Sequence, residues 1–219
     1  MTSKYDSFAA LHVPGDPVVL YNIWDPGSAL AVAAAGAKAL ATGSHPVGDA
    51  SGFGDAHQVP LDYVFANARR IMTAVDLPLS VDFEGAYSTD PEEGAANVAA
   101  LKETGAVGCN FEDQMVGGEG IHPLELQVRR IAAIRAAVGS DFFINARTDL
   151  LLKAAAIDDG VIDEVIARGK AFADAGASGF FVPRIADPKH IERVVREVPL
   201  PLNAIAFPGA PPKSEWATK

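Results

Sequence analysis

The sequence predicts an α/β fold of the (β/α)8 TIM-barrel type. Three observations lead to this prediction. Short apolar, β-rich runs alternate with longer Ala-rich helical stretches along the whole chain. The apolar runs do not alternate with polar residues, which is typical of parallel strands buried on both faces by helices. Polar residues recur directly after the strands, at the end of a barrel where active sites lie.

An open doubly wound sheet is the alternative architecture. A phosphate-binding glycine motif directly after the first strand would favour it. The chain has Trp24-Asp25-Pro26-Gly27 at that point, which is not such a motif. The barrel is therefore the preferred prediction.

The first half of the chain contains four predicted strands, at 18–21, 38–42, 79–83 and 107–111. Asp25-Pro26 opens the first long helix, with Asp as N-cap and Pro at the first helical position, and Gly36 ends it. Helices over 61–75 and 90–105 precede the third and fourth strands. Residues 43–58 are rich in Gly, Ser, His and Asp. We expect a long loop there, and its length makes it a functional candidate.

The second half contains three predicted strands, at 142–146, 179–182 and 202–206, and helices over 124–138, 161–175 and 187–197. The N-terminal segment 3–11 has a helical pattern. This gives seven strands, whereas a closed barrel of this type needs eight. We expect one barrel domain over residues 1–219, with a C-terminal β/α unit missing from this chain.

Composition excludes several classes of function. The 219 residues carry a formal net charge of −10 and no long cluster of Lys and Arg, so nucleic acid and membranes are not expected partners. No apolar run reaches membrane-spanning length. The single cysteine, Cys109, excludes an internal disulfide, and the N-terminus has no signal pattern. These features predict a cytoplasmic protein.

Four acids are candidate metal ligands: Asp82, Glu84, Glu112 and Asp55. Asp82 and Glu84 are two residues apart at the end of a predicted strand, so their side chains point to the same side. Oxygen ligands of this kind suit Mg²⁺, with Mn²⁺ as an alternative. The alternative interpretation is that these acids are solvated and form salt bridges with Arg147 or Arg184.

Arg147 follows the fifth predicted strand, where its planar fork can bind a substrate carboxylate or phosphonate. The alternative is a structural arginine that neutralises Asp82 or Glu112. A second candidate binding element is Thr42-Gly43-Ser44-His45, which offers a hydroxyl and backbone N–H groups to a small anion.

Three histidines lie in predicted loops at the functional end, and none has the spacing of zinc ligands: His45, His57 and His122. His122 is the best candidate of the three for acid/base chemistry, because it follows the glycine-rich segment 117–120.

Seven short motifs occur in order along the chain: Asn22-Ile23-Trp24-Asp25, Ala41-Thr42-Gly43-Ser44, Val81-Asp82-Phe83-Glu84-Gly85-Ala86-Tyr87, Asn110-Phe111-Glu112-Asp113-Gln114, Asn145-Ala146-Arg147-Thr148-Asp149, Ala175-Gly176-Ala177 with Phe181-Val182-Pro183, and Pro201-Leu202-Asn203. Each motif alone is weak, but the ordered set is specific. It resembles the isocitrate lyase/phosphoenolpyruvate mutase superfamily, from about residue 8 to about residue 208.

The resemblance implies a barrel that binds Mg²⁺ at the ends of its strands. It also implies cleavage or formation of C–C or P–C bonds next to a 2-oxo acid, through a metal-stabilised enolate. Asp82 matches the metal-binding aspartate, and Glu84 takes the place of the second acid of an Asp-x-Asp motif. Asp55 and Glu112 match further acids of the site. The candidate substrate-binding set is Tyr21, Thr42, Gly43, Ser44, His45, Arg147 and Asn203.

The chain departs from the superfamily in the loop over residues 115–122. Lyases that act on isocitrate or methylisocitrate carry Lys-Lys-Cys-Gly-His there, whereas this loop has neither Lys nor Cys. The longer gating loop of the mutases and phosphonopyruvate hydrolases is also missing. Glu119 or His122 is left as the candidate acid/base, beside Arg147 among the catalytic residues.

The first functional hypothesis is a Mg²⁺-dependent lyase that cleaves a C–C bond next to a 2-oxo or 2-hydroxy carboxylate. The second is P–C bond chemistry on a phosphonate, as in a phosphonopyruvate hydrolase or phosphoenolpyruvate mutase. The third is a catalytically degenerate barrel that binds a carboxylate without turnover. A homo-oligomer is compatible with the resemblance, although the helices that members exchange between subunits are missing from this chain.

Overall fold

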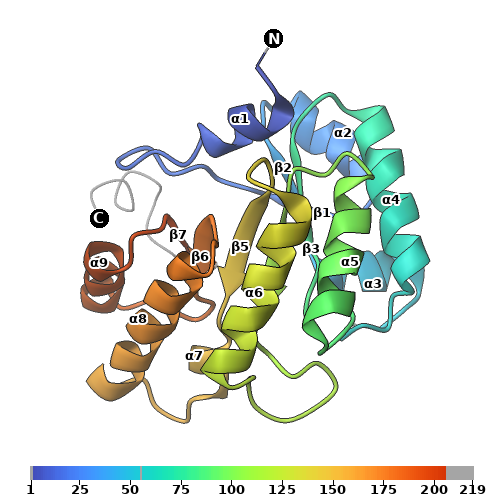
Figure 1. Cartoon of the computed structure of the whole chain (residues 1–219). Helices are drawn as coiled ribbons and strands as arrows, with labels where there is room; N and C mark the ends of the chain where they lie inside the picture. Colours follow the sequence, from blue (N-terminus) through green and yellow to red (C-terminus); the bar gives the residue numbers. More distant parts are fainter. Residues whose placement is uncertain (1, 55, 206–219) are drawn as a thin grey trace.

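The computed structural model describes residues 2–54 and 56–205. Its core is a seven-stranded, all-parallel sheet whose strand order follows the sequence (Figure 1). The strands are β1 (Asn22–Ile23), β2 (Leu40–Thr42), β3 (Leu79–Asp82), β4 (Gly108–Glu112), β5 (Phe143–Arg147), β6 (Gly179–Phe181) and β7 (Leu202–Asn203).

The helices in the described ranges are α1 (Lys4–Ala9), α2 (Pro26–Ala34), α3 (Ser44–Ser51), α4 (Leu61–Ala74), α5 (Pro91–Lys102), α6 (Leu124–Val138), α7 (Leu150–Lys153), α8 (Asp159–Asp174) and α9 (Pro188–Glu197). The expected caps are present, because the side chains of Asp25, Asp90 and Asp187 accept hydrogen bonds from the first turns of α2, α5 and α9.

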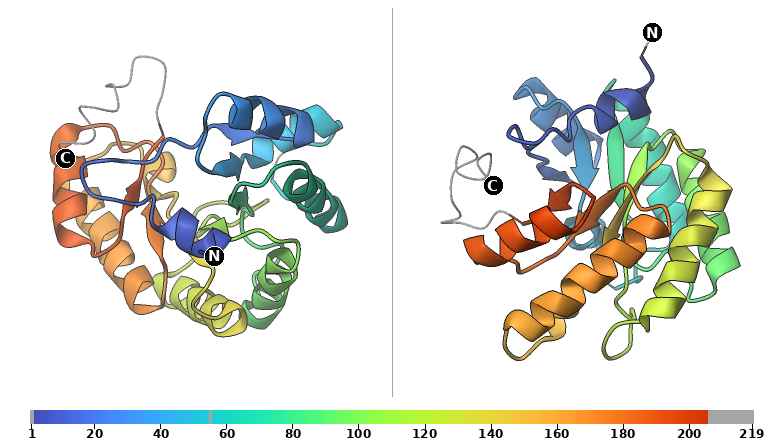
Figure 2. Two further views of the ribbon diagram at one scale, coloured as in Figure 1. Left: turned by 90° about the horizontal axis from the view of Figure 1, so that it is seen from above. Right: turned by 60° about the vertical axis from the view of Figure 1, so that its left-hand side comes forward.

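The sheet curves, and the long helices lie around its outer face (Figure 2). Each strand pairs with the strands before and after it in the sequence, from β1 to β7. A doubly wound sheet would instead reverse its order at a switch point. The α/β class and the parallel sheet are therefore confirmed. The arrangement is that of a TIM-type barrel opened between β1 and β7 within the described residues.

The two ends of the sheet differ. At the amino ends of the strands, Phe8 of α1 packs with Ala39, Val107 and Phe143 in a small apolar cluster. The His12 ring stacks on Phe143, with 4.4 Å between the ring centroids. Since α1 covers this end, the carboxyl ends of the strands are left for a site.

Several elements differ from the sequence-based prediction. The first strand lies at Asn22–Ile23 rather than at 18–21, because Val19 and Tyr21 are exposed and only Ile23 is buried. The segment 43–58 is not entirely loop: it contains α3, which ends at Gly52 in a left-handed conformation. The short helix α7 was not predicted. The last predicted strand extends to residue 206, which lies outside the described residues.

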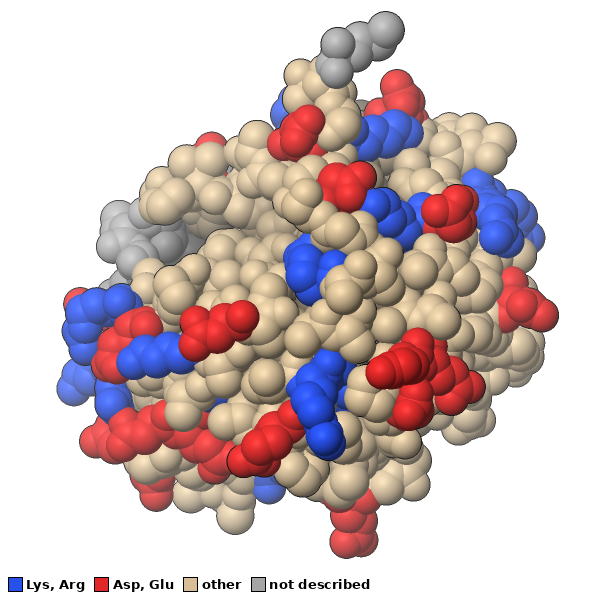
Figure 3. All heavy atoms as spheres, in the orientation of Figure 1, with Lys and Arg blue, Asp and Glu red and all other residues tan. Residues whose placement is uncertain are grey.

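On the face drawn in Figure 3, acidic and basic side chains are interspersed, so no large area carries charge of one sign only. No helix in the described part of the chain is both long and apolar enough to span a bilayer.

Candidate active site

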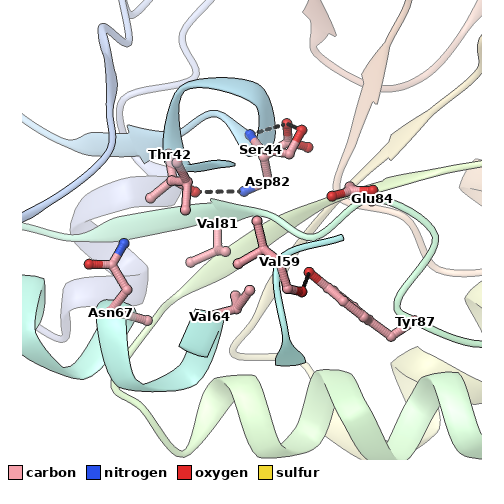
Figure 4. Close-up of a pocket in the computed structure, with 11 residues that line it drawn as sticks. Thr42, Ser44, Val59, Val64, Asn67, Val81, Asp82, Glu84 and Tyr87 are labelled. Atoms are coloured by element: carbon pink, nitrogen blue, oxygen red, sulfur yellow. Dashed lines mark hydrogen bonds between the residues drawn. The ribbon is translucent and has the colours of Figure 1, made fainter. Parts of the chain in front are cut away.

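Asp82 ends β3 and is held from two sides. Its Oδ2 accepts hydrogen bonds from the backbone N–H and the hydroxyl of Ser44, both at 3.0 Å (Figure 4). Its own backbone N–H donates to Oγ1 of Thr42, also at 3.0 Å. The second carboxylate oxygen, Oδ1, is buried and has no hydrogen-bond partner among the described residues. An unpartnered buried carboxylate oxygen is costly, and a cation would satisfy it.

The segment predicted to bind an anion, Thr42 to His45, contacts this carboxylate through Ser44. Gly43 is the N-cap of α3, and the first backbone N–H of that helix, from Ser44, donates to Asp82. A Cβ at Gly43 would lie 2.7 Å from Nδ2 of Asn22 and 3.0 Å from Cγ of Pro46, so a larger residue would have to displace these side chains. His45 is turned outward, 3.3 Å from Asp49.

Glu84 lies in a strained turn directly after β3. Glu84, Ala86 and Tyr87 have φ values of 49°, 57° and 59°, in the left-handed region that non-glycine residues rarely adopt. The buried Glu84 carboxylate accepts a hydrogen bond from the backbone N–H of His57 at 2.7 Å. The His57 ring accepts one from Gly85 N–H at 3.1 Å. The loop after β2 is thus tied to the turn after β3.

Arg147 ends β5, where the register places it beside Glu112 of β4. Its Nη1 lies 3.0 Å from a carboxylate oxygen of Glu112. Nε and Nη2 donate to the two oxygens of Asp149, at 2.6 and 3.0 Å. The expected neutralising role toward Glu112 is therefore present, and Asp149 fixes the plane of the guanidinium group. That orientation suits the binding of a further carboxylate.

Two buried acids that the sequence reasoning missed support this arrangement. The fully buried Asp113 follows Glu112, and its Oδ1 accepts a hydrogen bond from the backbone N–H of Asp149 at 2.9 Å. Its Oδ2 pairs with Arg168 of α8 at 3.1 Å. Both acids stand within the motifs at the ends of β4 and β5, and their position directly after a strand end was the available signal.

The environment raises the pKa of Glu112 to about 8. Burial is the main cause. The Arg147 charge opposes the shift, and the neighbouring acids Asp149, Asp82 and Glu84 add to it. Because burial and three neighbouring acids all disfavour the charged carboxylate, a divalent cation bound nearby would stabilise its ionised form.

This pKa predicts how stability depends on pH in the metal-free protein. An acid whose folded pKa of about 8 exceeds its ordinary 4.5 binds its proton more tightly in the folded state. The free energy of unfolding then falls as pH rises toward 8, by at most about 1.4 kcal/mol per pH unit. Urea unfolding in EDTA at pH 6.5, 7.2 and 8 measures the slope. Glu112→Gln should flatten it, and an unchanged slope would refute the assignment.

The described acids do not converge as a preformed cage. No three His, Cys, Asp or Glu side chains in residues 2–54 and 56–205 are close enough to hold one ion together. Asp55, the fourth predicted ligand, lies outside the described residues. Mg²⁺ commonly binds one or two carboxylates and keeps several waters. Asp82 would therefore hold Mg²⁺ through its free Oδ1, and Glu84 and Glu112 would be the other acids of the site.

The loop after β4 forms a small hairpin. Gln114 and Ile121 make an isolated antiparallel bridge, and Met115 N–H donates to the Gly120 carbonyl at 3.2 Å. Glu119 is exposed near the tip of this hairpin. His122 is buried at its base, and burial together with the Arg130 charge lowers its pKa. The two acid/base candidates therefore have different environments.

Of the two remaining substrate-binding candidates, Tyr21 lies away from this group. Tyr21 precedes β1, is 66% exposed, and lines a surface groove with Leu11 and Val32. Asn203 ends β7 and is half-buried. The cavity beside Asp82 measures about 20 Å³, which is room for one water molecule. A substrate would therefore bind on the open side of the strand ends.

Comparisons with known proteins agree with this fold. The sequence matches the family described as Phosphoenolpyruvate phosphomutase over residues 8–218. An uncharacterized Mycobacterium tuberculosis protein is 34% identical over 93% of this chain and 75% of its own length. A solved structure from Burkholderia cenocepacia J2315, named provisionally as a phosphonomutase, is 41% identical. It has a TM-score of 0.96 and the match covers 99% of this chain and 89% of that one.

Two further matches are named for a reaction. A Corynebacterium glutamicum protein, named provisionally as a 2-methylisocitrate lyase, is 34% identical over 66% of this chain and 47% of its own length. The structure of a phosphonopyruvate hydrolase in complex with oxalate and Mg²⁺ has a TM-score of 0.87 at 22% identity, and covers 99% of this chain and 77% of that one. At 22% identity, the match to the phosphonopyruvate hydrolase shows a similar fold only.

Proposed function

The chain belongs to the phosphoenolpyruvate phosphomutase family, within the isocitrate lyase/phosphoenolpyruvate mutase superfamily of lyases and mutases that act on carboxylates and phosphonates, and on that premise we propose a specific activity. We propose that it is a Mg²⁺-dependent lyase that cleaves a C–C bond next to a 2-oxo or 2-hydroxy carboxylate. The observation that carries this proposal is the buried Oδ1 of Asp82, which has no hydrogen-bond partner among the described residues. Asp82 ends β3 and Arg147 ends β5, so both lie at the same edge of the sheet.

Each residue of the site has a role in this proposal. Ser44 binds Oδ2 of the Asp82 carboxylate and Thr42 accepts from the Asp82 backbone N–H, which leaves Oδ1 for the ion. Bound Mg²⁺ would stabilise negative charge that develops on the substrate oxygen. Arg147, held in plane by Asp149, binds the substrate carboxylate through its remaining N–H groups. Either Glu119 or His122 transfers the proton at the carbon where the bond breaks.

One relative named for C–C bond cleavage supports the lyase proposal. The 34% identical protein from Corynebacterium glutamicum is named for methylisocitrate cleavage, although the chain spans about half of its length. The loop over 115–122 lacks the Lys and Cys of such enzymes. We therefore expect a smaller di- or tricarboxylate, such as a substituted malate or oxaloacetate, rather than isocitrate or methylisocitrate.

P–C bond chemistry is the second candidate. It is favoured by the 41% identity to the protein named provisionally as a phosphonomutase. The same acids and arginine would serve it, because both reactions place negative charge on the oxygen of a 2-oxo acid. Phosphorus NMR of phosphonopyruvate incubated with the protein distinguishes the two, since unchanged substrate excludes the second candidate.

Removal of the metal tests the proposed activity. The protein is dialysed against EDTA and incubated with a panel of 2-oxo and 2-hydroxy di- and tricarboxylates, with and without Mg²⁺. We expect release of pyruvate or glyoxylate only when Mg²⁺ is present. No release from any substrate, together with calorimetric binding of oxalate, would support the degenerate carboxylate-binding barrel instead.

A further inference from the structure

The turn that carries Glu84 is held by side chains from two helices on the outer face of the sheet. Arg130 of α6 donates from Nη2 to the carbonyl oxygens of Gly85, at 2.7 Å, and Ser88, at 2.8 Å. Asn97 of α5 donates to the carbonyl of Ala86 at 3.0 Å. Three carbonyls of one short turn therefore accept hydrogen bonds from side chains rather than from the backbone.

Arg130 is itself built into the core. It is 2% exposed, its Nη1 donates to Gln127 Oε1 at 2.7 Å, and its guanidinium lies 4.7 Å from the centroid of the Phe111 ring. Phe111 directly precedes Glu112 on β4. Burying a guanidinium group is costly, so its placement beneath a strained turn calls for a role beyond packing.

The strain indicates what that role is. Glu84, Ala86 and Tyr87 adopt left-handed conformations, which are unfavourable for residues other than glycine. Such a turn persists only where its surroundings over-determine it. Released from Arg130, it would relax toward an ordinary conformation and move the Glu84 backbone, which also accepts the N–H of Glu112 at 3.0 Å.

We propose that Arg130 is a positioning residue for the metal site: its fork holds the turn over 85–88 so that Glu84 stays beside Asp82. This inference rests on the proposed function. An arginine is required because one planar group reaches two carbonyls and Gln127 while stacking on Phe111. A lysine keeps the charge but has a single nitrogen, which cannot make all of these contacts.

The test compares Arg130→Lys with Arg129→Lys, the same substitution at the exposed neighbour on α6. Mn²⁺ binding, followed by electron paramagnetic resonance, is measured alongside kcat, KM and thermal unfolding. For Arg130→Lys we expect Mn²⁺ affinity to fall by about tenfold and kcat by a similar factor, because one or two charge-assisted hydrogen bonds are lost. KM should change little, since Arg147 still binds the substrate. Arg129→Lys should match the wild type.

Asn97→Ala provides a second, milder variant that keeps the proposal testable if Arg130→Lys does not fold. We expect it to weaken Mn²⁺ binding by a few-fold, as one neutral hydrogen bond to the turn is lost. Wild-type Mn²⁺ affinity in a folded Arg130→Lys or in Asn97→Ala would overturn the inference alone. A wild-type protein that neither binds Mn²⁺ nor turns over substrate would overturn both the inference and the proposed function.

Discussion

Asp82→Asn is expected to lower kcat by about 10³-fold, because it removes the one carboxylate among the described residues whose buried oxygen has no hydrogen-bond partner and is left for the ion. The stability of the folded protein should not decrease. Asparagine is nearly isosteric and its carbonyl oxygen can still accept from Ser44, while the unpartnered negative charge is gone. We therefore expect a metal-free midpoint of thermal unfolding equal to or above that of the wild type, which is the behaviour of a residue kept for activity at a cost in stability.

Asp76→Asn is the matched control. Its side chain is 97% exposed and pairs with Lys4 on the surface, so both activity and stability should stay at wild-type values. Substantial activity in Asp82→Asn at saturating Mg²⁺ would contradict the assigned role. A large drop in its unfolding midpoint would show instead that Asp82 is a structural acid.

Arg147→Lys should lower kcat/KM by about 10²-fold or more, mainly through KM. Lysine keeps the positive charge beside Glu112, but it cannot pair with both oxygens of Asp149 and also present a fork to a substrate. Replacement by methionine is expected to cost about 3–5 kcal/mol of stability in addition, because it leaves the buried Asp149 and Glu112 without their cation. Steady-state kinetics and urea unfolding measure the two effects separately.

Arg184→Lys is the control for this substitution. Arg184 also follows a strand of the sheet, but it donates to the carbonyls of Leu151 and Ala154 near α7. It should therefore have little effect on KM. An Arg147→Lys enzyme with wild-type KM would show that the guanidinium group only neutralises Glu112.

Local sequence patterns predict much of the fold. The runs that become β3, β4 and β5 are apolar, buried on both faces, and end in the polar residues of the site, so their positions were predicted to within a residue or so. Helix ends with Asp caps were predictable for the same local reason. β1 was misplaced because Val18, Val19 and Tyr21 have strand-like composition, whereas burial of Ile23 decides where pairing occurs.

The candidate site was predictable as a set of residue types but not as a set of contacts. Strand ends fixed which acids and which arginine share one edge of the sheet. Only the tertiary structure shows that Ser44 binds Asp82, or that Asp149 accepts two hydrogen bonds from Arg147. Arg130 lies on a helix whose sequence resembles any amphipathic helix, and its contact with a turn 45 residues away leaves no local signal.

A crystal grown with Mg²⁺ and oxalate tests the central claim most directly. The proposal predicts an ion about 2.1 Å from Oδ1 of Asp82. It also predicts oxalate bound to that ion, with one carboxylate on Arg147, and Glu84 and Glu112 reaching the ion through water. An ion or an oxalate bound elsewhere, with Asp82 in contact only with Ser44, would contradict the proposed metal site.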